Sequence, residues 1–180
     1  MRAQTLRLWV GDKVARIRMR PMQDDVIAFT DSVTSARSVL VIMPLDQGRT
    51  PPPHPVLEYL HRTYAEGSIT VITHEADLGL TRRLPRSTVI RIVPSDLTPL
   101  FLPRKEFLQR VMVKPFDLAL DLNLDFLLPS AYICRASRAR VRIGFVRERS
   151  EGYYNFTINA NPTLRRDEVY GRLTRYLQMF

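Results

Sequence analysis

Residues 115–145 read PFDLALDLNLDFLLPSAYICRASRARVRIGF, and this stretch has the pattern of a strand, a helix and a second strand. Residues 116–122 are almost continuously apolar and end in polar residues, which is typical of a buried parallel strand. Residues 127–136 have helical spacing, and residues 140–145 alternate arginine with apolar side chains, which predicts a half-exposed strand. About 30 residues are what a βαβ unit needs. The stretch therefore predicts two parallel strands joined by a helix.

The same alternation of strands and helices continues on both sides of this unit. Apolar runs predict strands at residues 38–43, 69–73 and 88–93, and helical patterns occupy residues 24–37, 55–66, 77–84 and 103–113. An extended segment at residues 153–160 and a helix at residues 165–180 follow the unit. We therefore predict an α/β fold of three layers, Rossmann-like. It would have a mainly parallel sheet of about five or six strands with helices on both faces, preceded by N-terminal helices.

The chain length of 180 residues fits one domain with its own core. We expect residues 1–37 to form an N-terminal helical extension packed on the domain, and residues 38–180 to form a single Rossmann-like domain. Residues 3–19 predict an amphipathic helix, bent or broken near Gly11, whose apolar stripe consists of Leu6, Trp9, Val10, Val14 and Ile17. This stripe could pack on the domain or make a peripheral contact with a membrane through residues 1–20.

The composition is that of an ordinary globular protein, with 45% apolar and 25% charged residues. No apolar run approaches the ~20 residues of a transmembrane segment, and the first residues lack the apolar core of a signal peptide. We expect a cytoplasmic protein, either free or peripheral at the inner face of the membrane. The single cysteine, Cys134, is interpreted as a buried structural thiol.

The formal charge of +9 comes from 24 arginines and 3 lysines against 18 acidic residues. Such a balance favours an anionic partner, although GC-rich coding also enriches arginine over lysine. One cluster is predicted to form a basic face: Arg135, Arg138, Arg140 and Arg142. A solvated surface without a partner is the alternative interpretation.

The stretch at residues 115–145 resembles a segment of the ADP-heptose:lipopolysaccharide heptosyltransferases, glycosyltransferase family 9. The matching positions are Phe116, Asp117, Leu118, Asp121 and Leu122 at its start and Arg142, Ile143, Gly144 and Phe145 at its end. Similar residues follow at Tyr154, Asn155, Val169, Arg175, Tyr176 and Leu177. The resemblance implies the N-terminal, acceptor-side half of such an enzyme, a GT-B half that lacks the C-terminal donor-binding domain.

The resemblance also implies where a catalytic base would lie. When residues 42–57 are laid over the corresponding family segment without gaps, Ile42, Gly48, Pro55, Val56 and Leu57 are in register, and Arg49 occupies the position of the aspartate base. Because arginine stays protonated, it cannot accept the proton of an acceptor hydroxyl. The chain is therefore not expected to be an enzyme by itself, and Asp46 is the weak alternative as a base.

Ligands of open α/β sheets bind beyond the carboxyl ends of the strands. The predicted ligand or anion site at that edge consists of Gln47, Arg49, Thr50, His74, Asn123 and Asp125. Asp121 and its neighbours have the spacing of polar groups at a strand end, and the three histidines have no metal-binding spacing. We therefore expect neither a metal nor a cofactor.

Three functions remain open from the sequence. The first is a glycosyltransferase-like domain that is not catalytic alone and acts as a binding or scaffold subunit with another protein. The second is the acceptor-binding half of a split glycosyltransferase that a separate donor-domain chain completes. The third is a basic accessory protein that binds RNA, a ribosome or a large complex. The expected partners are accordingly another protein and an anionic sugar, phosphate or nucleic acid.

Overall fold

A six-stranded sheet forms the centre of the protein, and every pair of neighbouring strands in it is parallel. The computed structural model describes residues 2–22, 29–45, 53–74, 84–160 and 163–179. The strands are β1 (Val39–Ile42), β2 (Ile69–Thr73), β3 (Thr88–Arg91), β4 (Leu118–Asp121), β5 (Val141–Phe145) and β6 (Phe156–Ile158). The helices are α1 (Arg2–Met19), α2 (Phe29–Thr34), α3 (His54–Thr63), α5 (Lys105–Val111), α6 (Leu128–Ala136) and α7 (Arg166–Gln178), with a short 3₁₀ turn at Pro94–Asp96.

The strand order is β3-β2-β1-β4-β5-β6. Starting from β1, the chain builds the sheet outward through β2 and β3, and then returns to the other side of β1 with β4. Val39 of β1 is opposite Ile69 of β2 and Leu118 of β4, which places β1 and β4 at the centre. All residues of β1 and β4 are buried, as the apolar runs predicted. The three-layer α/β fold expected from the sequence is confirmed.

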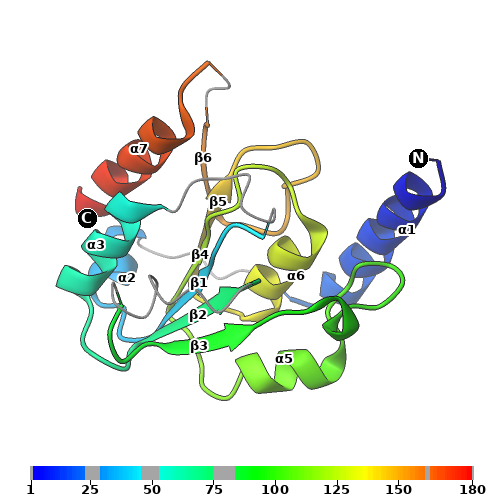
Figure 1. Ribbon diagram of the computed structural model, residues 1–180, viewed down its shortest axis with the longest axis horizontal. Coiled ribbons are helices and arrows are strands. Elements are labelled where there is room, and N and C mark those ends of the chain that lie inside the picture. The colour runs from blue at the N-terminus through cyan, green and yellow to red at the C-terminus, as the bar shows by residue number, and fades with distance from the viewer. Residues whose placement is uncertain (1, 23–28, 46–52, 75–83, 161–162, 180) are drawn as a thin grey trace.

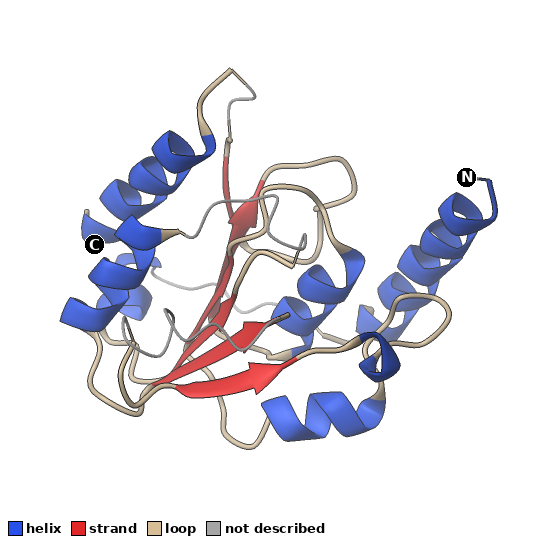
Figure 2. Ribbon diagram, in the orientation of Figure 1, coloured by secondary structure: helices blue, strands red, loops and turns tan. Residues whose placement is uncertain are grey.

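Helices cover both faces of the sheet (Figures 1 and 2). Apolar residues of α2, α3 and α7 pack on one face. On the other face, α5 and α6 contribute Phe107, Val111 and Ile133 to a second core. The helix α1 lies outside α6, and a third apolar cluster that includes Ala15 and Tyr132 joins the two. The core thus has three parts, and α1 extends it on the α6 side.

Several predicted elements have nearly the expected bounds. The βαβ unit consists of β4, α6 and β5, and β2 spans the predicted residues 69–73. Proline lies in the first turn of both α3 and α6, where its missing N–H costs no hydrogen bond. Of the helix predicted at residues 24–37, the structure describes residues 29–37 and shows a helix only at α2. The helix predicted at residues 77–84 lies almost entirely outside the described residues.

The prediction that residues 140–145 form a half-exposed strand was wrong, because every residue of β5 is buried. A sixth strand, β6, pairs with β5 in parallel, so β5 is an interior strand and not an edge. Arg142 lies within this strand. Its Nε donates to the carbonyl oxygen of Tyr153 at 3.2 Å, and its guanidinium also donates to that of Ala139 at 2.8 Å. These bonds allow a charged side chain in a buried position.

Only part of the expected apolar stripe of the first helix faces the core, because Val14 packs against the third apolar cluster while other members do not. The helix α1 is continuous through Gly11, and it buries Gly11, Asp12, Ala15 and Met19. Leu6, Trp9 and Ile17 of the predicted stripe are exposed instead. A Cβ added to Gly11 would lie 2.2 Å from the carbonyl oxygen of Leu100, so only glycine permits this approach of α1.

Candidate functional site

The six parallel strands all end at one edge of the sheet, the carboxyl edge. The order of the strands reverses between β1 and β4, and ligands of such sheets bind at that switch point. The segments that leave these strands are residues 43–45 after β1 and residues 122–126 after β4.

Asn123 joins these two segments. Its side-chain oxygen accepts a hydrogen bond from the backbone N–H of Leu45 at 2.7 Å, and its Nδ2 donates to the carbonyl oxygen of Met43 at 3.2 Å. Asn123 is buried, so both bonds are shielded from water. The side chain therefore fixes the start of the loop that follows β1.

Asp121, the last residue of β4, is enclosed beneath Asn123. One carboxylate oxygen accepts hydrogen bonds from the backbone N–H and the Nδ2 of Asn123, at 3.1 and 2.7 Å. The other accepts from the hydroxyl of Tyr154 at 2.6 Å. Burial raises the pKa of Asp121, while these donors oppose the shift. Both oxygens thus have protein partners, and only 2% of the residue is exposed.

Tyr154 completes this polar cluster because β5 carries a glycine beneath the ring. A Cβ on Gly144 would lie 2.7 Å from carbon atoms of the Tyr154 ring. The ring can therefore lie against the backbone of β5 and direct its hydroxyl to Asp121. Tyr154 was absent from the predicted site residues, and glycine within a strand was the signal that another group approaches closely there.

Buried charges surround the same cluster. Burial raises the pKa of the Cys134 thiol well above its usual value, and the nearby carboxylate of Asp121 adds to this shift. The guanidinium groups of Arg142 and Arg135 act in the opposite direction on the pKa of the thiol. As expected, Cys134 is a buried thiol.

The loop after β4 is tied to the fold at two further points. The hydroxyl of Tyr170 on α7 donates to the carbonyl oxygen of Leu122 at 2.7 Å, and the Nε of Arg147 donates to that of Leu124. Asp125 follows directly and is exposed. The loop therefore presents one carboxylate to solvent from a fixed backbone.

His74 lies at the end of β2, on the other side of β1 from Asn123. It is half-buried, its carbonyl oxygen accepts a hydrogen bond from Arg91, and its Nδ1 is buried without a hydrogen-bond partner among the described residues. The remaining predicted residues of this edge, Asp46, Gln47, Arg49 and Thr50, lie outside the described residues. The structure thus brings Asn123 to the switch point, with Asp125 in the same segment after β4 and His74 at the end of β2.

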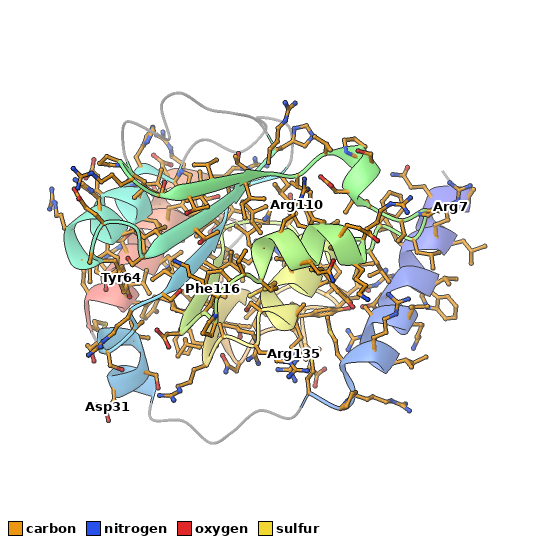
Figure 3. The ribbon with its side chains drawn as sticks, turned by 90° about the horizontal axis from the view of Figure 1, so that it is seen from below. Arg7, Asp31, Tyr64, Arg110, Phe116 and Arg135 are labelled. Atoms are coloured by element: carbon orange, nitrogen blue, oxygen red, sulfur yellow. The ribbon has the colours of Figure 1, made fainter. Side chains whose placement is uncertain are left out.

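Only two of the four arginines that were predicted to form a basic face are exposed. Arg138 and Arg140 are exposed, but Arg135 and Arg142 are buried. Arg135 extends from α6 toward the residues after α1, where it donates to the carbonyl oxygen of Met22 (Figure 3). The two exposed arginines precede β5, so they lie at the amino edge of the sheet, opposite the switch point. They do not share a surface with the candidate ligand site.

Within the described ranges, no group of three or more histidine, cysteine, aspartate or glutamate side chains could hold a metal ion. Among the described residues of this edge, the amide of Asn123 is bonded within the protein, whereas Asp125 is exposed and His74 is half-buried.

The parallel sheet with helices on both faces defines a Rossmann-like α/β domain. It is similar to the structure of E. coli heptosyltransferase WaaC with ADP, at 15% identity and a TM-score of 0.51 over 77% of this chain and 46% of that one. It is also similar to E. coli heptosyltransferase WaaC with ADP-2-deoxy-2-fluoro heptose, at 17% identity and a TM-score of 0.50 over 79% of this chain and 49% of that one. The chain thus spans about half the length of these structures, and the likeness shows a heptosyltransferase-like fold.

The sequence itself belongs to a family of unknown function, DUF6913, whose model matches residues 90–180. This match includes the βαβ unit of β4, α6 and β5 together with the polar cluster at the switch point. No curated protein matches the chain in sequence.

Proposed function

We propose that the protein corresponds to the acceptor-side half of a heptosyltransferase-like fold, and that it binds a sugar phosphate at the carboxyl edge of its sheet without catalysing glycosyl transfer alone. It then acts as a binding subunit. The observation that carries this proposal is the enclosure of Asp121, whose carboxylate oxygens are bonded to Asn123 and Tyr154.

A general base must reach the hydroxyl from which it takes a proton, within about 3 Å or through one water. Asp121 is buried and its hydrogen bonds are already made within the protein, so it serves the fold. By resemblance, the usual position of the base is Arg49, a residue that cannot take up a proton. Both features support binding without transfer.

The polar groups around the edge fit a phosphorylated sugar. Asp125 and His74 can hydrogen-bond sugar hydroxyls, and Arg49 would supply the charge for a phosphate. Asn123 contributes indirectly, because it holds the backbone of Leu45, four residues before Arg49 in the sequence.

Backbone amide NMR tests the binding, with glucose 6-phosphate, inorganic phosphate and ADP as separate probes. We expect glucose 6-phosphate to shift the amides of Leu45, His74 and Asp125 at millimolar concentrations, while inorganic phosphate shifts them less and ADP leaves them unchanged. Arg49→Ala should weaken the binding of glucose 6-phosphate about tenfold or more, because it removes a charge-assisted hydrogen bond. Arg140→Ala at the opposite edge is the matched control and should bind normally.

Three results would overturn the proposal. The first is an unchanged spectrum at this edge with glucose 6-phosphate, and the second is an equal loss of binding in the Arg49 and Arg140 variants. The third is release of ADP from ADP-heptose by the chain alone, in the presence of a sugar acceptor, because that would be catalysis.

A further inference from the structure

The helix α1 has an inner face toward the domain and an outer face toward solvent. Hydrogen bonds attach the inner face to the rest of the protein. The hydroxyl of Tyr153 donates to the carboxylate of Asp12 at 2.7 Å, and the Nε of Arg16 contacts the same carboxylate at 3.2 Å. The guanidinium of Arg16 also donates to the carbonyl oxygens of Glu151 and Arg149, at 3.1 and 2.9 Å. These contacts fix the rotation of α1 about its axis.

The outer face is therefore displayed in a defined orientation. Leu6 and Ile17 are each 62% exposed, and Trp9 is 50% exposed. At 100° per residue these side chains fall on one side of the helix, together with Lys13, whose ammonium group lies 5.7 Å from the centre of the Trp9 ring. Leu6 and Ile17 are about 16 Å apart along the axis. Three of the five residues of the predicted stripe, Leu6, Trp9 and Ile17, thus face away from the domain.

The exposed charges of α1 are all positive. Arg7, Lys13 and Arg18 lie on its surface, and Arg20 follows directly after it. The sole acidic residue in the helix is Asp12, which is buried and bonded to Tyr153 and Arg16. A cationic helix with Leu, Ile and Trp on its outer side has the composition of helices that lie in the interface of a bilayer.

We propose that the outer face of α1 binds the surface of an anionic lipid bilayer. The helix lies at the edge of the molecule, on the side away from the sheet, so a flat surface can approach it (Figure 1). Figure 3 shows Arg7 at the same edge. Leu6, Trp9 and Ile17 enter the interface, and the surrounding cations contact lipid phosphates, each strengthening binding about fivefold. One aromatic residue between aliphatic side chains does not make a stacking surface for nucleic acid.

No described helix is long and apolar enough to cross a membrane, so the contact proposed here is peripheral. The ligand edge of the sheet is a separate surface. Membrane binding through α1 is therefore expected whether or not the sheet edge binds a sugar phosphate.

Trp9 is the single tryptophan of the protein, so its fluorescence reports on this face without labelling. The full chain is mixed with vesicles of phosphatidylcholine alone or of phosphatidylcholine and phosphatidylglycerol at 3:1. We expect Trp9 emission to shift to shorter wavelength, and the protein to sediment with the vesicles, only when phosphatidylglycerol is present. Raising the salt from 0.05 to 0.5 M should weaken binding at least tenfold.

The double variant Leu6→Ser with Ile17→Ser should bind at least tenfold more weakly, and Lys13→Glu should lose a similar amount. Val113→Ser is the matched control, because Val113 is 81% exposed but lies after α5. Circular dichroism verifies that each variant is folded. The proposal fails if Trp9 emission is unchanged with anionic vesicles, or if the double variant binds as well as the control. Binding to poly(U) RNA in the absence of vesicle binding would also overturn it.

Discussion

Replacing Gly11 by alanine should lower the free energy of unfolding of the protein, although the same change normally stabilises a helix. Alanine in an exposed helix interior is more favourable than glycine by about 1 kcal/mol. At Gly11, however, the added Cβ would lie 2.2 Å from the carbonyl oxygen of Leu100 and 3.0 Å from a methyl group of Leu128. Backbone atoms cannot yield as a flexible side chain would, so α1 must shift. Overpacking of this kind costs about 1–3 kcal/mol, so after the helix gain of about 1 kcal/mol the expected net loss is up to about 2 kcal/mol.

Gly171 provides a matched control because it also lies within a helix, α7, and a Cβ there would meet nothing within 4 Å. Gly171→Ala should therefore raise the free energy of unfolding by up to about 1 kcal/mol. Urea denaturation followed by circular dichroism measures both variants. We expect the free energy of unfolding to fall in Gly11→Ala and to rise in Gly171→Ala. Equal stabilisation by Gly11→Ala and Gly171→Ala would refute the docked position of α1.

Three further predictions concern the buried polar cluster. Burial raises the pKa of Asp121, so the folded state binds a proton more tightly than the unfolded state, and the free energy of unfolding falls as pH rises from about 4 through the folded pKa. The Asp121→Asn variant should lack this decline. If urea titrations give the same difference in the free energy of unfolding between wild type and variant at every pH from 4 to 8, the prediction is contradicted. Arg142→Met should cost about 3 kcal/mol by urea denaturation, because two hydrogen bonds from a charged group are lost, whereas Arg140→Met should change little. Cys134 should resist Ellman's reagent at pH 8 in the folded protein and react in urea; rapid reaction without urea would show that the thiol is accessible.

The sheet could be predicted from the sequence because its central strands are buried on both faces. Such strands need continuous apolar runs, and residues 69–73 became β2 without any change of bounds. The polar residues after β4 were also expected to gather at the carboxyl edge, and Asn123 does join the ends of two strands there.

Other features depend on contacts that are distant in the sequence. Arginine at position 142 favours an exposed strand face, but its guanidinium is buried against the carbonyl oxygens of Tyr153 and Ala139, which the local sequence pattern does not indicate. The stripe with Leu6 and Ile17 has the spacing of a core face, yet the inner face of α1 is chosen by a glycine contact and by the pairing of Asp12 with Tyr153. Hydrophobic periodicity finds a stripe and does not say what covers it.

Tyr153 and Tyr154 are adjacent in sequence, yet their hydroxyls bond in different places, one to Asp12 on α1 and the other to Asp121 at the end of β4. This two-residue segment therefore links the first helix to the centre of the sheet. Removal of α1 would leave the Tyr153 hydroxyl without its partner Asp12. Tyr153 is adjacent to Tyr154, whose hydroxyl bonds to Asp121 at the switch point. We therefore expect the N-terminal helix to unfold together with the sheet, so that a bilayer bound at α1 would stabilise the same folded state as a ligand bound at the sheet edge.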